Sequence, residues 1–280
     1  MLLHKNTSNV KKSHLIIMEL IFILTVSFCI LLYSIQCNKP EKVIIFDFDE
    51  TLGSFSEMNL IVHILYSLRT KPDITFTEIT FHVCSLFPEY FRKDIFSALE
   101  FIKQSKENKD IHKVVMYTNN NGGKYWVSSV LEYIHHVLGC DLFDEVITSY
   151  HCLHEEQNDM RRISEEKQIA DIKKIINLHP HSEFVFFDDR YHEKMDSEFV
   201  YYIKINPYIY SYDIEDIIKR LQLYYFDKTC VEFVQKRLRE KYNNYKQHFN
   251  AKCSSQYNNT LDMERIILNI DLICSSFILL

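Results

Sequence analysis

Short apolar runs alternate with longer amphipathic ones along most of the chain after residue 41. The short runs are apolar on both faces, which is the pattern of strands buried inside a parallel sheet. They are KVIIFDF (42–48), KVVMYT (113–118), EVIT (145–148), FVFFDD (184–189) and VYYIKI (200–205). Helical patterns lie between them at 92–104, 124–138 and 164–178. This alternation predicts an α/β fold, a three-layer Rossmann-like sandwich with a mainly parallel central sheet.

Two further features of this pattern concern the helices. The helix predicted at 124–138 has one apolar face, and Gly139 is expected to be its C-cap. That face consists of Trp126, Val127, Val130, Leu131, Ile134, Val137 and Leu138. Residues 53–90 are largely helical in pattern and predict a small cap-like insertion after the first strand, near the mouth of a site at the sheet edge. Gly53 is expected to be the bend where the chain leaves the sheet.

The two ends of the chain depart from the α/β pattern. A basic tail (1–14) precedes an apolar segment (15–36) long enough for a transmembrane or signal-anchor helix. A cleaved signal peptide or a soluble core helix are the alternatives for this segment. We expect a membrane-associated protein, with a single pass near the N-terminus. The α/β domain is predicted at 42–226, and a C-terminal helical extension at 227–280.

Composition narrows the classes of function. The formal net charge is −6, and the chain shows no basic patch of the kind that binds a phosphate backbone, so nucleic acid is not an expected partner. The eight cysteines show neither a C-x-x-C pair nor a zinc-ligand spacing. They are typical of buried apolar thiols, although a disulfide stays open if the domain lies in an oxidising compartment.

Two of the predicted strands end in pairs of carboxylates. Asp47 and Asp49 follow the first strand, and Asp188 and Asp189 end the fourth. Ligands of parallel sheets bind at the carboxyl ends of the strands, where four carboxylates would repel one another unless a cation lay between them. Oxygen ligands of this kind suit Mg²⁺. A helix cap or a turn is the alternative for either pair alone, but the two pairs together predict a Mg²⁺ site formed by all four aspartates.

The segment YTNNNGGKYW (117–126) predicts a phosphate-binding loop. Thr118 closes a strand, Asn119 opens a tight Asn/Gly loop, and a helix begins near Lys124. A hydroxyl group and backbone amides at a helix N-terminus form an anion site. A hairpin turn is the alternative for Asn-Gly, but the residues that follow have a helical period. We therefore expect Thr118 and Asn119 to bind phosphate.

Lys167 is the candidate cation for this anion site. It falls in the first turn of the predicted helix at 164–178, with Ser164 as the expected cap. Positive charge is unfavourable at that end of a helix unless an anion lies nearby. A surface pair with Asp171, four residues further on, is the alternative explanation.

Taken in this order, the motifs resemble the haloacid dehalogenase superfamily. Within that superfamily, the D-x-D-E-T-L form of the first motif in this chain is similar to the NLI-interacting-factor or CTD-phosphatase branch. The resemblance is closest to the relatives of that branch in large DNA viruses. The likeness covers about residues 43–212 and rests on DFDETLGSF (47–55), FPEYFR (87–92), YTNN with Trp126, Arg162 with Lys167, and Asp188 with His192. One difference is RKDI (92–95) at the start of the crossover helix, where relatives often have R-P-G.

The resemblance implies a Mg²⁺-dependent phosphatase that acts through an aspartyl-phosphate. Asp47 would be the nucleophile, and Asp49 would protonate the leaving oxygen and then activate water. The other implied roles are phosphate contacts by Thr118, charge neutralisation by Lys167, and Mg²⁺ binding by Asp188 with Asp189 as second ligand or orienter.

Several alternatives stay open. The phosphorylated substrate is either a protein or a small molecule. A non-catalytic, membrane-anchored binding or receptor module with the same fold is the second hypothesis, although a module without turnover would be free to lose Asp47, Asp49 and Lys167. A polynucleotide-end phosphatase is the third, and neither a basic groove nor a kinase P-loop is present in the sequence to favour it.

Overall fold

The computed structural model describes most of residues 40–222 and smaller parts of both ends. The described residues are 18, 21–29, 40–69, 73–122, 124–149, 161–176, 178, 180–222, 232–233, 235–240, 242, 267–268 and 270. Two compact units are present: residues 1–40 with 179–181, and residues 41–178 with 182–280. The predicted C-terminal extension (227–280) lies mostly outside the described residues.

In the N-terminal unit, residues 21–29 are helical and their side chains are exposed. The predicted membrane segment (15–36) lies only partly within the described residues. Among the helices that are described, none is both long and apolar enough to be a candidate membrane span.

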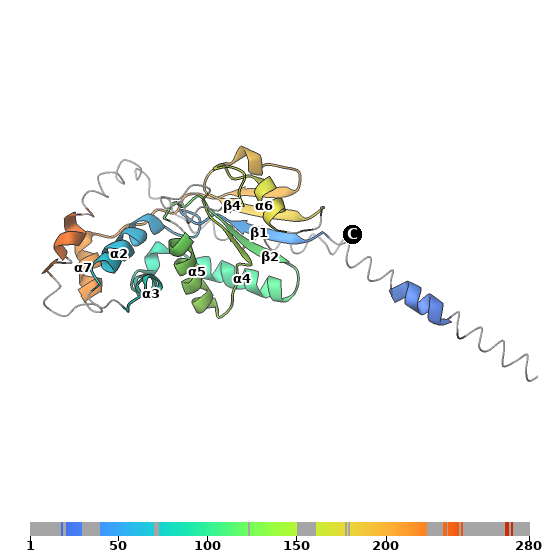
Figure 1. Cartoon of the computed structure of the whole chain (residues 1–280), viewed down its shortest axis with the longest axis horizontal. Helices are drawn as coiled ribbons and strands as arrows, with labels where there is room; N and C mark the ends of the chain where they lie inside the picture. Colours follow the sequence, from blue (N-terminus) through green and yellow to red (C-terminus); the bar gives the residue numbers. More distant parts are fainter. Residues whose placement is uncertain are drawn as a thin grey trace, which may run out of the picture. The chain divides into compact units, whose positions relative to one another are not determined.

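The larger unit is built on a five-stranded sheet in which every strand pair is parallel (Figure 1). The strands are β1 (Lys42–Phe46), β2 (Lys113–Tyr117), β3 (Glu145–Ile147), β4 (Glu183–Asp188) and β5 (Val200–Lys204). Their order is β3-β2-β1-β4-β5, so β1 lies in the centre and the chain reverses its direction of winding beside it. The predicted parallel sheet is confirmed. Its switch point, where ligands bind in such folds, lies at the carboxyl ends of β1, β2 and β4.

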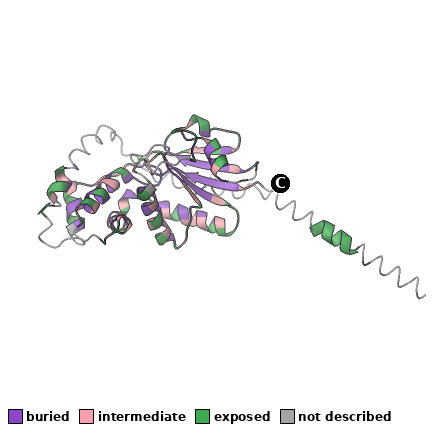
Figure 2. Cartoon of the chain, viewed as in Figure 1, coloured by how far each residue is buried: buried purple, intermediate pink, exposed green. Residues whose placement is uncertain are grey.

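Helices cover both faces of the sheet, as Figure 1 shows for α4, α5 and α6. Alternate residues of β1 point to opposite faces: Ile44 and Phe46 join one buried cluster, and Val43 and Ile45 join the other. The helices are α2 (Phe55–Ser67), α3 (Phe76–Leu86), α4 (Ile95–Glu107), α5 (Lys124–Leu138), α6 (Ile169–Ile175) and α7 (Ile214–Gln222), with short 3-10 turns η1 (Pro88–Tyr90) and η3 (Glu193–Met195). Figure 2 shows the central strands β1, β2 and β4 largely buried and the helices around the sheet buried on one side, which is the three-layer arrangement that the sequence predicts.

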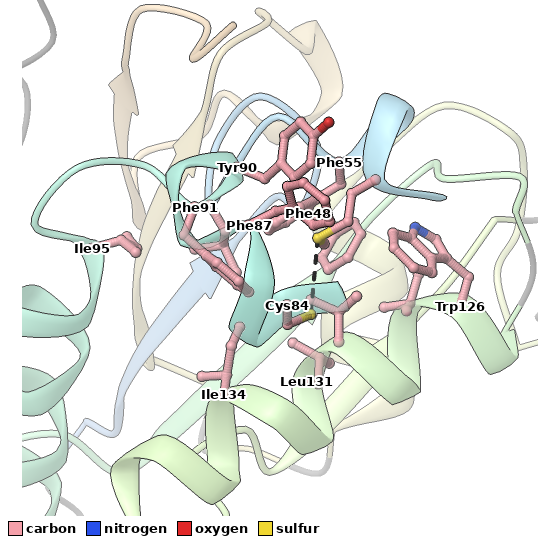
Figure 3. Close-up of a cluster of buried hydrophobic side chains, with 14 of the residues drawn as sticks. Phe48, Phe55, Cys84, Phe87, Tyr90, Phe91, Ile95, Trp126, Leu131 and Ile134 are labelled. Carbon is pink, nitrogen blue, oxygen red and sulfur yellow. Dashed lines mark hydrogen bonds between the residues drawn. The ribbon is translucent and has the colours of Figure 1, made fainter. Parts of the chain in front are cut away.

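Residues 53–90, expected to be largely helical, contain α2, α3 and η1. Thr75 and Glu78 form a capping box at the start of α3. α3 packs against α5, and α2 packs against α3, within an apolar cluster that includes Phe55, Cys84 and Trp126 (Figure 3). The insertion is therefore anchored to the same helix that follows the predicted phosphate-binding loop.

Two local expectations need correction. Gly53 is not a positive-φ bend; a Cβ there would lie 2.5 Å from the Tyr90 carbonyl oxygen, so close packing requires the glycine. The left-handed residue of this turn is Glu50, with φ of 59°. On the face predicted for α5, Val137 is 48% exposed because the helix reaches the edge of the core near its end. Gly139, by contrast, has the φ of 69° expected of a C-cap.

Asp94, the residue before α4, also adopts a left-handed conformation, with φ of 63°. Its side chain makes no hydrogen bond to the helix N-terminus. In the sequence Arg92-Lys93-Asp94 it stands at the position of the glycine in the R-P-G pattern of the family that the sequence resembles. The difference noted in the sequence therefore falls on a residue that occupies a glycine conformation.

We expect the Asp94→Gly variant to be about 1 kcal/mol more stable than Asp94→Ala, because glycine adopts this φ without the strain caused by a Cβ atom. Both substitutions remove the same carboxylate from the start of α4, so the comparison isolates the backbone. Equilibrium urea unfolding of the full-length variants measures the difference. Equal or greater stability of the alanine variant would contradict the expectation.

Candidate active site at the carboxyl ends of the strands

The turn after β1 carries Asp47 and Asp49 out of the sheet. The backbone N–H of Asp47 still donates to the Phe187 carbonyl of β4, at 2.9 Å, so this residue is held by the sheet itself. The next residues are held by Arg92, a buried side chain that donates to the carbonyl oxygens of Glu50 (2.6 Å) and Thr51 (2.7 Å). The path of the turn is thus fixed on both sides of Asp49.

A buried ammonium group joins the carboxylates that end β1 and β4. Lys167 Nζ lies 2.5 Å from Asp47 Oδ1 and 2.7 Å from Asp188 Oδ2, and the lysine is 2% exposed. Burial alone would lower the pKa of Lys167, but the two carboxylates raise it above its usual value. Lys167 is therefore charged at neutral pH, and residues far apart in the sequence meet at one point, as predicted.

Asp188 has two further anchors besides the lysine. Its Oδ1 accepts a 2.7 Å hydrogen bond from the Arg190 backbone, and its Oδ2 lies 3.3 Å from His192 Nε2. Burial opposes ionisation, but the hydrogen bonds from His192 and Lys167 lower the pKa of Asp188 below its usual value. The carboxylate stays ionised and is held in one orientation.

Three of the four predicted metal ligands converge. Asp47, Asp188 and Asp189 each offer a carboxylate oxygen within 4.8 Å of the others, and all three are buried. Burial, reinforced by the charges of Asp47 and Asp188, raises the pKa of Asp189 to about 8. A divalent cation would relieve this repulsion, so the donor set fits Mg²⁺. Asp49, the fourth carboxylate of the predicted site, does not belong to this group of three.

Asp49 faces the loop after β2 instead. Its Oδ2 accepts a 2.6 Å hydrogen bond from Asn120 Nδ2, and its Oδ1 is buried without a hydrogen-bond partner among the described residues. Burial raises the pKa of Asp49 to about 7, against the opposing effect of the Asn120 amide. The carboxyl group therefore exists in both protonation states near neutral pH.

The predicted phosphate-binding loop lies beside these acids. Thr118 is buried at the end of β2, and its Oγ1 accepts a 3.0 Å hydrogen bond from the Asn120 backbone. The loop leads directly into α5 (Lys124–Leu138), so the hairpin alternative is wrong. The amide oxygen of Asn119 is already engaged, because its Oδ1 accepts a 2.6 Å hydrogen bond from Arg162 NH1.

Arg162 is a buried residue for which the sequence suggested no role beyond its spacing to Lys167. Its guanidinium donates to Asn119 Oδ1, to the Thr148 carbonyl after β3 (3.1 Å) and to the Glu165 carbonyl (2.8 Å). It also forms an ion pair with Asp171, 3.5 Å away, and both side chains are fully buried. Arg162 thus ties the phosphate-binding loop to the segment that carries Lys167.

The helix position expected for Lys167 was wrong, and so was the alternative of a surface pair. It does not lie in the first turn of a helix capped by Ser164, because α6 begins only at Ile169. Nor does it form a surface pair with Asp171, which is buried and accepts a 2.5 Å hydrogen bond from Tyr117 Oη. The extended backbone at Gln168 turns Lys167 inward, toward the strand ends.

These groups border one cavity with a volume of about 530 Å³. Every lining residue is polar or glycine, and Ser56 and Asn59 are contributed by α2 of the insertion. The lining residues are Asp47, Asp49, Ser56, Asn59, Thr118, Asn119, Asn120, Asn121, Gly122, Lys167, Asp188, Asp189, Arg190 and His192. All seven residues that the sequence singled out as catalytic, phosphate-binding or metal-binding are among them.

We expect Arg162→Met to lower the free energy of unfolding by about 3–5 kcal/mol, because it leaves the buried Asp171 carboxylate without its cation. Arg161→Met is the matched control. Arg161 is 46% exposed and pairs with the partly exposed Glu145. The control should lose less than about 1 kcal/mol. Urea unfolding of both variants tests the difference, and equal losses would show that the buried pair is not a principal support of the site.

Comparison with known proteins gives little guidance. No family model matches the chain, and no curated protein matches it. Among solved structures, it is similar to a haloacid dehalogenase-like family hydrolase from Xanthomonas campestris, with 13% identity and a TM-score of 0.32. The alignment covers 62% of this chain and 87% of that one. A likeness this distant carries no functional argument, so the function has to be inferred from the site itself.

Proposed function

We propose that this protein is a Mg²⁺-dependent phosphomonoester hydrolase that acts through an aspartyl-phosphate on Asp47. The observation that carries the proposal is the contact of Asp47 with the buried, charged Lys167 in a polar cavity that Thr118 and Asp49 also line. A carboxylate nucleophile, a fixed cation, a hydroxyl donor and a carboxyl group that titrates near neutrality are the parts that phosphoryl transfer requires.

Asp47 is suited to the nucleophilic role because its carboxylate is held at both oxygens. Lys167 contacts Oδ1, and Thr51 Oγ1 lies 3.3 Å from Oδ2. In the first step, one carboxylate oxygen attacks phosphorus while the bond to the leaving oxygen breaks. Asp49, in its neutral form, gives its proton to that oxygen. The products of this step are an alcohol and the phosphorylated Asp47.

The second step regenerates the site. Asp49 is now a carboxylate, and it takes a proton from a water molecule that attacks phosphorus. The bond between phosphorus and the Asp47 oxygen breaks, and inorganic phosphate leaves. Lys167 and the Thr118 hydroxyl are placed to stabilise the charge on the phosphoryl oxygens during both steps.

The proposal includes Mg²⁺ because the converging carboxylates form a set of oxygen donors that suits this ion. Asp47, Asp188 and Asp189 would hold Mg²⁺, which when bound would neutralise negative charge on the phosphoryl group. Among these residues, Asp188 is the most firmly oriented, through His192 and the Arg190 backbone. Its role in the site is to keep an ionised oxygen facing Asp47.

Asp47→Asn should lower the hydrolysis of 4-nitrophenyl phosphate by the full-length protein in Mg²⁺ by at least about 1,000-fold, because the amide is not a nucleophile. Asp110→Asn is the control, since Asp110 is exposed before the amino end of β2, away from the site. Steady-state rates of the three proteins measure the effect. Wild-type activity no higher than that of Asp47→Asn would sink the proposal and favour a binding module.

The rate should also depend on pH through Asp49. Because burial raises the pKa of this group to about 7, its acid form is lost as the pH rises through that value. Proton donation to a poor leaving group then fails, so kcat/KM for an alkyl phosphate should decrease between about pH 6 and 8. Profiles at constant Mg²⁺ for wild type and Asp49→Asn measure this. An increase across the same range would be inconsistent with Asp49 as the acid.

A further inference from the structure

We infer that Asn120 is a positioning residue that holds the Asp49 carboxyl group against the phosphate-binding loop and so determines which of its oxygens can serve the leaving group. The inference rests on the function proposed for this site. The observation that carries it is the 2.6 Å hydrogen bond from Asn120 Nδ2 to Asp49 Oδ2. The sequence assigned a role to Asn119 but none to Asn120.

Asn120 is itself held by the loop. Its backbone N–H donates to Thr118 Oγ1 at 3.0 Å, and its side-chain Oδ1 accepts a 2.8 Å hydrogen bond from the Gly122 backbone. Because the Gly122 N–H needs an acceptor, the amide oxygen faces Gly122 and the amide nitrogen faces Asp49. Through its backbone and its side chain, Asn120 therefore links the Thr118 hydroxyl, the loop backbone and the proposed acid.

The space around this amide leaves it little freedom. A Cβ atom at position 122 would lie 2.9 Å from Asn120 Oδ1 and 2.9 Å from Asn59 Nδ2. Glycine at 122 thus allows Asn120 and the α2 residue Asn59 to approach the same point of the loop. The position of the amide depends on this close approach.

Asp49 has little else to orient it. The bond from Asn120 is the one side-chain hydrogen bond that its carboxyl group accepts among the described residues, and Oδ1 is buried without a partner. Because the Asn120 amide occupies Oδ2, Oδ1 is the oxygen left without a protein partner. We therefore assign Oδ1 as the oxygen that serves the leaving group.

Loss of the hydrogen bond from Asn120 to Asp49 should lower the rate by a factor that depends on the basicity of the leaving group. A good leaving group, such as 4-nitrophenolate, needs little protonation, whereas an alkoxide needs a well-placed acid. A residue that only supports the fold would slow all substrates by a similar factor. The dependence of rate on leaving-group basicity therefore separates positioning of the acid from a general structural effect.

The test compares full-length wild type, Asn120→Ala and Asn120→Asp on a series of substituted phenyl phosphates and on ethyl phosphate, in constant Mg²⁺. Asn120→Asp keeps the shape and the acceptor for Gly122 but removes the donor to Asp49. Both variants should lose about 100-fold more kcat/KM on ethyl phosphate than on 4-nitrophenyl phosphate, and the plot of log kcat/KM against leaving-group pKa should become steeper.

Asn121→Ala is the matched control, because this neighbouring residue also lines the cavity but is exposed and takes no part in the hydrogen bonds described for Asn120. It should leave the slope of the plot unchanged. Thermal unfolding of each variant checks that the protein is folded, and the isosteric Asn120→Asp variant serves if alanine is not tolerated.

The outcomes distinguish a failure of the positioning role of Asn120 from a failure of the proposed function. Steeper slopes for both Asn120 variants, with a wild-type slope for Asn121→Ala, support the positioning role. An active wild type whose slope equals that of folded Asn120→Asp overturns the inference and leaves the proposed function standing. A wild type no more active than Asp47→Asn overturns both.

Discussion

The contact of Lys167 with Asp47 and Asp188 is the constraint on which the site depends. The buried Lys167 ammonium lies within hydrogen-bond distance of both carboxyl groups, which are themselves almost fully buried. Removing such charges from water is costly, and the cost is offset only when the geometry is close to ideal. Asp47 and Asp188 come from neighbouring strands, and Lys167 comes from an irregular segment. The contact therefore requires both the strand order β2-β1-β4 and the observed path of residues 161–168.

Two buried arginines supply the rigidity that this geometry requires. Arg92 donates to carbonyl oxygens of the turn after β1 and of Asn206, which follows β5. Arg162 donates to carbonyl oxygens after β2 and β3 and ahead of Lys167. Because a guanidinium offers several donors in a fixed plane, each arginine holds segments that have no secondary structure of their own. These hydrogen bonds fix the loops at the strand ends relative to one another.

The strands could be predicted from the sequence because burial on both faces produces continuous apolar runs, and the acids at their ends followed from the same runs. The irregular segments could not. Glu50 and Asp94 both adopt left-handed conformations that glycine favours, so the residue types at these two positions did not predict the backbone conformation. Lys167 was placed in a helix because the helical period of α6 extends back to it, whereas its inward direction is set by contacts with residues more than 20 positions away. Patterns of local period carry no information about such contacts.

The three consecutive asparagines of the loop show where residue type stops being informative. Asn119 Oδ1 is bound by Arg162, Asn120 bridges Gly122 and Asp49, and Asn121 is exposed. The side chains are chemically identical, so only the backbone path assigns their partners. That path is fixed from outside the loop, by Arg162 on one side and by the approach of α2 to Gly122 on the other. The insertion therefore does more than border the cavity, because its packing helps to determine which amide faces the proposed acid.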